Sequence, residues 1–174
     1  INTHPSNISQ CIAGKSKTSR DLHFEYVSYE EYKEYVNSKK KPFLYPHQED
    51  AIKRMFNGCI LNGGVGSGKS RTGLYYYFQS YGGHMQPFRP MRAGAPDLII
   101  ITTAMKRDKL EWEAELCPFL MSTNPEVNYY KNKVVVDSWQ NITKYADVKN
   151  AFFIFDEQRL VGNGTWVKSF LNIA

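Results

Sequence analysis

Cysteine is scarce in this 174-residue chain, which contains only Cys11, Cys59 and Cys117. An odd number of widely spaced cysteines fits neither a disulfide framework nor a Cys-x-x-Cys metal site, so we expect a reducing, cytoplasmic setting. The four histidines are equally scattered along the chain, which argues against a zinc site.

Long hydrophobic runs are lacking too, and none approaches the roughly 20 residues that a membrane-spanning helix needs. No signal-peptide pattern opens the chain, so we expect no membrane partner. Neither sign of charge dominates, because 22 Lys and Arg against 17 Asp and Glu give a net charge of +5. That charge is compatible with a polyanionic partner but identifies none. The chain starts at Ile1 and stops at Ala174 within an apolar stretch. These ends suggest a fragment or a processed product, although removal of a tag would look the same.

Apolar residues are sufficient for a folded core, since the chain is 42% hydrophobic and 14% aromatic. Short apolar segments alternate with helical patterns, which predicts an α/β fold with a mostly parallel β-sheet and helices on both faces. The expected strands are 59–61, 97–103, 133–136 and a buried strand at 151–155. The expected helices are 69–80, 105–116 and 138–145. Residues 81–96, rich in glycine and proline, are expected to form a long loop rather than an element.

The N-terminal part is less regular. Residues 1–20 show no periodicity and are expected to be a tail, whereas 22–26 alternate as a short strand does. Ser28 and Glu31 have the spacing of a capping box and predict the start of a helix. Pro46 suits the first turn of a second helix. The apolar positions of that second helix are Ala51, Ile52, Met55 and Phe56.

The segment Gly63–Ser70 reads Gly-Gly-Val-Gly-Ser-Gly-Lys-Ser and satisfies the phosphate-loop pattern G-x-x-x-x-G-K-[ST] in full. Its glycines let successive backbone N–H groups converge on phosphate oxygens, and the following helix directs its positive dipole end at the same anion. Lys69 is expected to reach the β- and γ-phosphates, and Ser70 to ligate Mg²⁺. A glycine-rich turn with a surface lysine is the alternative. The candidate nucleotide-binding residues here are Gly63, Gly64, Val65, Gly66, Ser67, Gly68, Lys69, Ser70 and Arg71.

Two acidic residues follow the last apolar run. Asp156 and Glu157 come directly after Phe152–Phe155, which places them at the carboxyl edge of the expected sheet, where open α/β sheets bind ligands. Asp156 is expected to hold Mg²⁺ through water, and Glu157 to orient and deprotonate the attacking water. The alternative is that both acids start a solvated turn.

These motifs together resemble the first RecA-like lobe of superfamily-two DNA helicases and translocases, and look most like the small helicases encoded by tailed phages. The resemblance covers about residues 42–174, and its motifs occur in the family's order. They are Tyr45-Pro46-His47-Gln48 (the glutamine motif), Gly63–Ser70 (motif I), Ile99–Thr103 with Lys106, Arg107 and Trp112 (motif Ia), and Asp156-Glu157-Gln158-Arg159 (motif II). Motif II has the form Asp-Glu-Gln-Arg in place of the commoner forms that end in His or Asp. The segment Val136-Asp137-Ser138-Trp139 lies where the family has a further DNA-contacting segment.

The resemblance implies an ATP hydrolase that moves along DNA. It implies that Gln48 reads the adenine, that Lys69, Asp156 and Glu157 are catalytic, and that Ser70 and Asp156 hold Mg²⁺ beside ATP. Single-stranded or duplex DNA and a second RecA-like lobe, which supplies an arginine, are the implied partners. Residues 1–40 would be an extension and 41–174 the first lobe, apparently truncated after motif II, with the second lobe absent. The implied location is the cytoplasm, that of the host if a phage encodes the protein.

Other interpretations remain open at several positions. Gln48 also fits a polar residue on the wet face of a helix. Thr102, Thr103, Lys106 and Arg107 suit either phosphate contacts or a helix cap with solvated cations, and Trp139 suits either base stacking or the core. The competing functions are another phosphate-loop motor of the restriction or packaging type, a truncated non-catalytic module that binds DNA or a partner, and, last, a small-molecule kinase.

Overall fold

The computed structural model describes residues 18–19, 22–23, 28–38, 42–157 and 164–173. The chain divides into two compact units. We call Glu25–Ala95 the phosphate-loop unit, and Pro96–Ala174 together with Ile1–Phe24 the sheet unit. The expected division at residue 40 rests on the family's motifs and stays a prediction. In the described residues no helix is long and apolar enough to cross a membrane.

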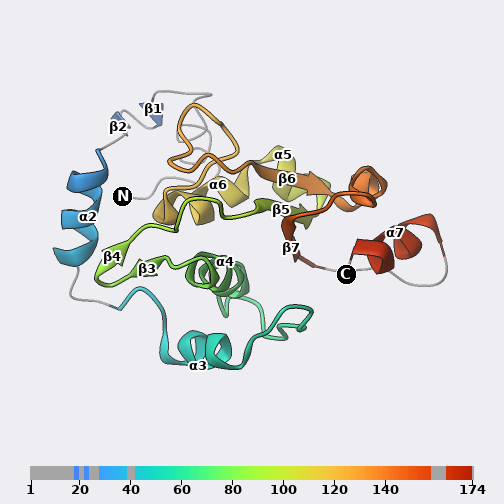
Figure 1. Cartoon of the computed structure of the whole chain (residues 1–174), viewed down its shortest axis with the longest axis horizontal. Coiled ribbons are helices and arrows are strands. Elements are labelled where there is room, and N and C mark those ends of the chain that lie inside the picture. The colour runs from blue at the N-terminus through green and yellow to red at the C-terminus, as the bar shows by residue number, and fades with distance from the viewer. Residues whose placement is uncertain (1–17, 20–21, 24–27, 39–41, 158–163, 174) are drawn as a thin grey trace. The chain divides into compact units, whose positions relative to one another are not determined.

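The sheet unit is built around three parallel strands in the order β6-β5-β7 (Figure 1). They are β5 (Asp97–Thr102), β6 (Val134–Ser138) and β7 (Ala151–Phe155). Leu98 of β5 pairs with Val134 on one side and with Phe152 on the other, so the carboxyl ends of all three strands meet at one edge. The expected α/β architecture is confirmed in this small, three-stranded form.

One face of this sheet forms an aromatic core with two flanking helices, the 3₁₀ helix η2 (Trp139–Tyr145) and α7 (Thr165–Ile173). Ile99 and Ile101 of β5 cluster with Trp139 and Ile142 of η2. Phe155 of β7 stacks on Trp139, with ring centroids 5.6 Å apart. Burial of each such side chain contributes about 1.5–3 kcal/mol of stability. The helix expected at 138–145 is therefore present, although in the tighter 3₁₀ form.

The helix expected over 105–116 is wrong as a single element. It is broken into α5 (Ala104–Asp108) and α6 (Glu111–Leu116), followed by the short 3₁₀ helix η1 (Cys117–Phe119). The break lies at Leu110, which has a left-handed φ of 55°. In one continuous helix, Lys106 and Trp112 would point about 120° apart. The break lets α5 place Lys106 at the strand ends while α6 buries Trp112.

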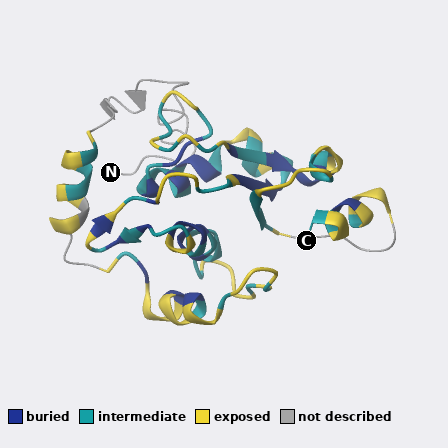
Figure 2. Cartoon of the chain, viewed as in Figure 1, coloured by how far each residue is buried: buried dark blue, intermediate teal, exposed yellow. Residues whose placement is uncertain are grey.

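Strand β7 is half-buried along its whole length, which corrects the expectation of a fully buried strand. Central β5, in contrast, is buried from Leu98 to Thr102 (Figure 2). In the described sheet β7 has a neighbour on one side only, because it lies at the end of the strand order. An edge position leaves part of each side chain uncovered, and a short apolar run alone does not distinguish an edge strand from a central one.

The phosphate-loop unit contains three helices and a short hairpin in its described part. The helices are α2 (Tyr29–Ser38), α3 (Pro46–Arg54) and α4 (Lys69–Ser80). The capping box at the start of α2 is confirmed, because the Ser28 backbone N–H donates to Glu31 Oε2 (2.8 Å) and the Glu31 N–H donates to Ser28 Oγ (3.3 Å). Tyr75, Tyr77 and Phe78 of α4 are buried, as expected of core side chains.

Helix α3 ends earlier than its apolar pattern predicts. Met55 already has extended backbone (φ −70°, ψ 145°), and the Phe56 side chain is 66% exposed. Gln48 and Ile52 are the buried residues of this helix. The four-residue apolar face expected from Ala51 onward is therefore wrong beyond Ile52.

Two further expectations for this unit need correction. The segment 81–96 contains an antiparallel hairpin, β3 (His84–Met85) and β4 (Phe88–Arg89), so it is not simply a loop. The buried Phe88 anchors the hairpin through ring contacts with Tyr32 of α2 and Phe78 of α4. No strand forms at 59–61 within the described residues, and the Ile60 side chain is 91% exposed. A three-residue run stabilises a strand only through hydrogen bonds to a neighbouring strand.

At the N-terminal end, β1 (Thr18–Ser19) pairs antiparallel with β2 (Leu22–His23) in the sheet unit. The strand expected at 22–26 is thus present at its first two residues, and 24–26 lie outside the described residues. Most of the expected tail, residues 1–20, also lies outside them.

Candidate nucleotide-binding site

The phosphate loop leads directly into the first turn of α4. Gly66 and Gly68 both have φ of +77°, a left-handed conformation that glycine adopts without steric cost. Gly68 is the N-cap residue of α4, so the helix begins at Lys69. An N-terminus preceded by a glycine-rich loop presents unpaired backbone N–H groups and the positive end of a helix dipole, which together attract phosphate.

The side chain of Lys69 folds back over the loop. Its ammonium donates to the carbonyl oxygens of Gly63 (2.7 Å) and Gly64 (2.9 Å). A further turn is closed by the Ser67 N–H, which donates to the Gly64 carbonyl at 3.3 Å. The predicted phosphate-binding lysine is therefore held above its own loop by two charge-assisted hydrogen bonds.

The remaining candidates of this segment are spread around the loop. Val65 at the loop tip is fully exposed, and Ser70 is half-buried in the first turn of α4. The Arg71 guanidinium lies over the Phe43 ring, 5.4 Å from its centroid. Such a cation–π contact directs the Arg71 side chain toward Phe43, which precedes the glutamine motif.

Gln48 is buried, with 3% of its surface exposed, which excludes the interpretation that it lies on the wet face of its helix. Its side-chain oxygen accepts from the Tyr45 backbone N–H (2.8 Å). Its amide nitrogen donates to the carbonyls of Ser67 (3.3 Å) and Gly68 (3.4 Å) in the phosphate loop. Gln48 thus connects the start of α3 to the loop.

In the sheet unit, Asp156 lies where β7 ends, as predicted. Its backbone N–H donates to the carbonyl of Ile101 (2.8 Å), which continues the strand pairing by one residue. Its Oδ2 accepts from Thr102 Oγ1 (2.8 Å) and from the Lys106 ammonium (2.9 Å). The same ammonium is 2.7 Å from Glu157 Oε1. Glu157 has a φ of 52°, a conformation that costs a non-glycine residue about 1 kcal/mol or more.

Lys106 is therefore the shared partner of both acids. Burial by itself would lower the pKa of Lys106, but hydrogen bonds to Glu157 and Asp156 and their charges outweigh it and raise the pKa above its usual value. A pair of carboxylates arranged around a cation is also the oxygen-donor chemistry that Mg²⁺ prefers. The expected metal residue Asp156 fits a magnesium ion in this respect, as does the hydroxyl of Ser70.

A third carboxylate at this edge is Asp137, which lies in the segment Val136–Trp139 and was given no chemical role of its own in the sequence analysis. It is 9% exposed at the end of β6 and accepts from Arg107 Nη1 (3.0 Å), Asn141 Nδ2 (2.7 Å) and Tyr145 Oη (2.8 Å). Burial alone would raise the pKa of Asp137, but hydrogen bonds from Asn141, the Ser138 backbone, Tyr145 and Arg107 outweigh it and lower the pKa. An aspartate directly after Val134–Val136, at a strand's carboxyl end, was the signal available in the sequence.

We predict that Asp137→Asn lowers the free energy of unfolding at pH 7 by about 2 kcal/mol, because hydrogen bonds to a buried charged group are lost. A lowered folded-state pKa contributes stability above the unfolded pKa of about 3.9, and the contribution disappears as the pH falls through the lower folded value. Urea unfolding of both proteins at pH 7 and pH 3 measures the difference. The exposed Asp147→Asn is the matched control. Equal stability of the Asp137 variant and the wild type at pH 7 would contradict the prediction.

One of the open interpretations is settled by these contacts, that of Trp139. Trp139 is 7% exposed, and its indole N–H donates to the Asp156 carbonyl at 3.0 Å, so it belongs to the core. Thr103 is the N-cap of α5, and its hydroxyl accepts from the Lys106 backbone N–H at 3.3 Å. Lys106 and Arg107 are engaged with carboxylates rather than solvated.

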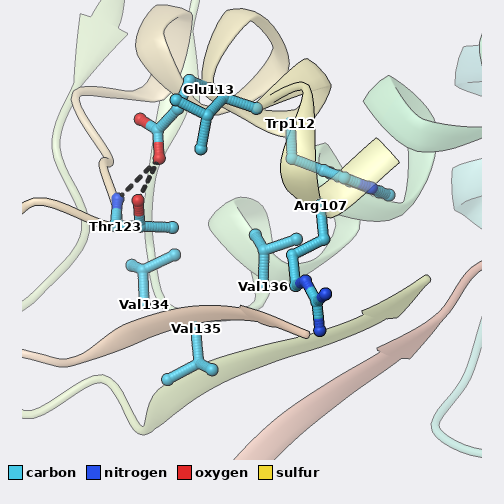
Figure 3. A pocket seen from close by; sticks show the side chains of 8 residues that line it. Arg107, Trp112, Glu113, Thr123, Val134, Val135 and Val136 are labelled. Carbon is cyan, nitrogen blue, oxygen red and sulfur yellow. Dashed lines mark hydrogen bonds between the residues drawn. The ribbon is translucent and has the colours of Figure 1, made fainter. Parts of the chain in front are cut away.

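A pocket of about 260 Å³ also lies in the sheet unit, between α6 and β6. Figure 3 shows side chains that line it, among them Trp112, Val134 and Val136. Glu113, which also lines the pocket, is 1% exposed, and its two oxygens accept from Ser122 (2.9 Å) and from the Thr123 backbone N–H (3.0 Å). Both oxygens of Glu113 therefore support the 122–123 loop, and the walls of the pocket are mainly apolar.

Among the described residues, no three His, Cys, Asp or Glu side chains gather as a metal-binding cluster. Comparison of the chain with protein-family models, with curated proteins and with solved structures finds no match.

Proposed function

We propose that this chain is the RecA-like, ATP-binding lobe of an ATP-dependent DNA helicase or translocase. The observation that carries the proposal is the phosphate loop, a full motif match that forms a glycine loop at the N-terminus of α4 with the Lys69 ammonium folded over it. The helix that follows the loop is part of the context that gives the motif its meaning, whereas the strand expected before the loop at 59–61 is not formed in the described residues.

The loop, Lys69, Ser70 and the two acids each have a role in this proposal. Backbone N–H groups of the loop and the α4 dipole hold the phosphates of ATP, and Lys69 exchanges its two carbonyl partners for phosphate oxygens. Ser70 and Asp156 hold magnesium, which supplies charge neutralisation at the phosphates when it is bound. Glu157 orients the attacking water and accepts its proton.

DNA as partner is the less direct part of the proposal. It is supported by the motif order and by Thr103 and Arg107 beside the strand ends of the sheet unit. Hydroxyls, guanidinium groups and helix N-termini contact phosphates without reading sequence. In the resembling family a second RecA-like lobe supplies an arginine to the γ-phosphate, a group worth about 10³–10⁵ in rate in other phosphate-loop enzymes.

The test is ATP hydrolysis by the longest available product of this reading frame, with and without single-stranded and duplex DNA. We expect strong stimulation by at least one form of DNA. The 174-residue chain alone is expected to bind Mg-ATP weakly and to turn it over slowly, and robust turnover by it would contradict that expectation. ATP turnover that DNA does not change would still support nucleotide binding by the phosphate loop, but it would favour another phosphate-loop ATPase over a helicase.

A further inference from the structure

The amide of Gln48 is used at both ends by the protein's own backbone. A carboxamide oxygen can accept two hydrogen bonds and the nitrogen can donate two, and reading adenine as a bidentate pair needs one free site on each. Here the oxygen accepts from Tyr45 at 2.8 Å, and the nitrogen donates to two loop carbonyls at 3.3 and 3.4 Å. The side chain is also 3% exposed, so a base would have to displace these bonds in order to reach it.

The contact between Gln48 and the loop is close at Gly68. A side chain at this position would collide with the Gln48 amide nitrogen, so Gly68 is needed for space as well as for its φ of +77°. The Gly68 carbonyl also accepts from the hydroxyl and the backbone N–H of Thr72, each at 3.0 Å. His47 Nε2 lies 3.2 Å from the Ser67 carbonyl. Ser67 and Gly68, the last two residues before Lys69, are therefore held by contacts with side chains of α3, and Gly68 also by hydrogen bonds from α4.

From these contacts we infer that Gln48 is a positioning residue for the phosphate loop rather than a reader of the base. This inference rests on the proposed function, since it takes the loop to bind a nucleotide. Gln48 fixes the Ser67–Gly68 carbonyls away from the anion, which leaves the loop N–H groups directed at phosphate. The site then recognises the triphosphate, and its substrate class is nucleoside triphosphates with little preference for adenine.

Binding of three ligands to the full chain tests the inference: Mg-ATP, Mg-GTP and inorganic tripolyphosphate. We expect wild-type affinities for ATP and GTP that differ by less than about threefold, since a bidentate base reader would discriminate by about 1–3 kcal/mol, or roughly 5- to 150-fold. Gln48→Ala is expected to weaken all three ligands by the same factor of about ten, as loss of loop hydrogen bonds predicts. Isothermal titration calorimetry gives each dissociation constant.

A second variant distinguishes loss of the contact between Gln48 and the loop from loss of folding. Gln48→Glu retains the acceptor for the Tyr45 N–H and removes the donor to the loop, so α3 keeps its cap while the loop contact is lost. Hydrogen exchange of the 63–68 amides, measured without ligand, should accelerate in both Gln48 variants. Ile52→Ala, at the other buried position of α3, is the matched control and is expected to lower the melting temperature without accelerating exchange in the loop.

The possible outcomes distinguish failure of the positioning role of Gln48 from failure of the proposed function. Weaker binding of ATP alone, with tripolyphosphate unchanged, overturns the inference and leaves the proposed function intact. Unchanged exchange of the loop amides in both Gln48 variants also overturns it. Failure of the wild-type chain to bind any of the three ligands overturns the proposed function, whereas the exchange measurement still decides the positioning role.

Discussion

Lys69→Ala is expected to abolish measurable binding of Mg-ATP by this chain. The ammonium is the charged donor that the phosphate loop directs at its anion, and it is already held over the loop by the Gly63 and Gly64 carbonyls. Each hydrogen bond to a charged partner contributes about 1.5–3 kcal/mol, so loss of contacts to two phosphates weakens binding about 100-fold or more. Calorimetric titration with Mg-ATP measures the effect.

The control for this variant is Lys53→Ala, which removes an exposed lysine from α3 and is expected to bind as the wild type does. Melting temperatures of both variants should stay close to that of the wild type. Retention of ATP binding within about threefold by a folded Lys69→Ala protein would show that the loop is a glycine-rich turn, since a charged donor on the phosphates is worth more than that.

Glu157→Gln is expected to preserve nucleotide binding and to lower turnover by about 10²–10⁴ in the complete enzyme, because a general base contributes rate and little affinity. The glutamate suits this role, since it follows Asp156 directly and its side chain is 39% exposed to solvent, whereas Asp156 is only 10% exposed. Single-turnover hydrolysis and equilibrium binding, measured on the same preparation, separate the two effects.

Asp156→Asn is the second variant of this acidic pair, and its effect is expected to differ in kind from that of Glu157→Gln. Loss of the carboxylate expected to hold magnesium lowers the affinity for the metal as well as the rate, which titration with Mn²⁺ would detect. Equal ATP turnover by the wild type and the Glu157 variant would remove Glu157 from the base role.

Local patterns predicted the elements that are stabilised locally. The capping pair Ser28 and Glu31 and the glycine at position 68 each contain the information for their own structure. The prediction of a strand at 59–61 was wrong because a short strand depends on a distant partner strand that its own residues do not specify. The break at Leu110 reconciles two tertiary requirements, the ion pairs of Lys106 and the burial of Trp112.

The hydrogen-bond partners of the site residues could not be predicted from the sequence either. Gln48 was singled out by its place before the phosphate loop, but nothing in the sequence shows that its amide meets the Ser67 and Gly68 carbonyls. Asp137 and Tyr145 are eight residues apart and meet only because η2 turns back at the end of β6. Pairings of this kind arise from tertiary packing, which residue spacing does not encode.

The bridge made by Lys106 means that the acidic edge carries its own counter-ion. Two carboxylates next to each other in the chain would repel one another, and one ammonium at 2.7–2.9 Å from both reduces the local charge from −2 to −1. The lysine stem is long and flexible, so the ammonium can leave without movement of the backbone. A divalent cation that replaced it would change the local charge from −1 to zero and release a lysine whose helix begins at the same sheet edge. Replacement of the Lys106 ammonium by a divalent cation would therefore release a positive charge on α5 without any change in the backbone fold.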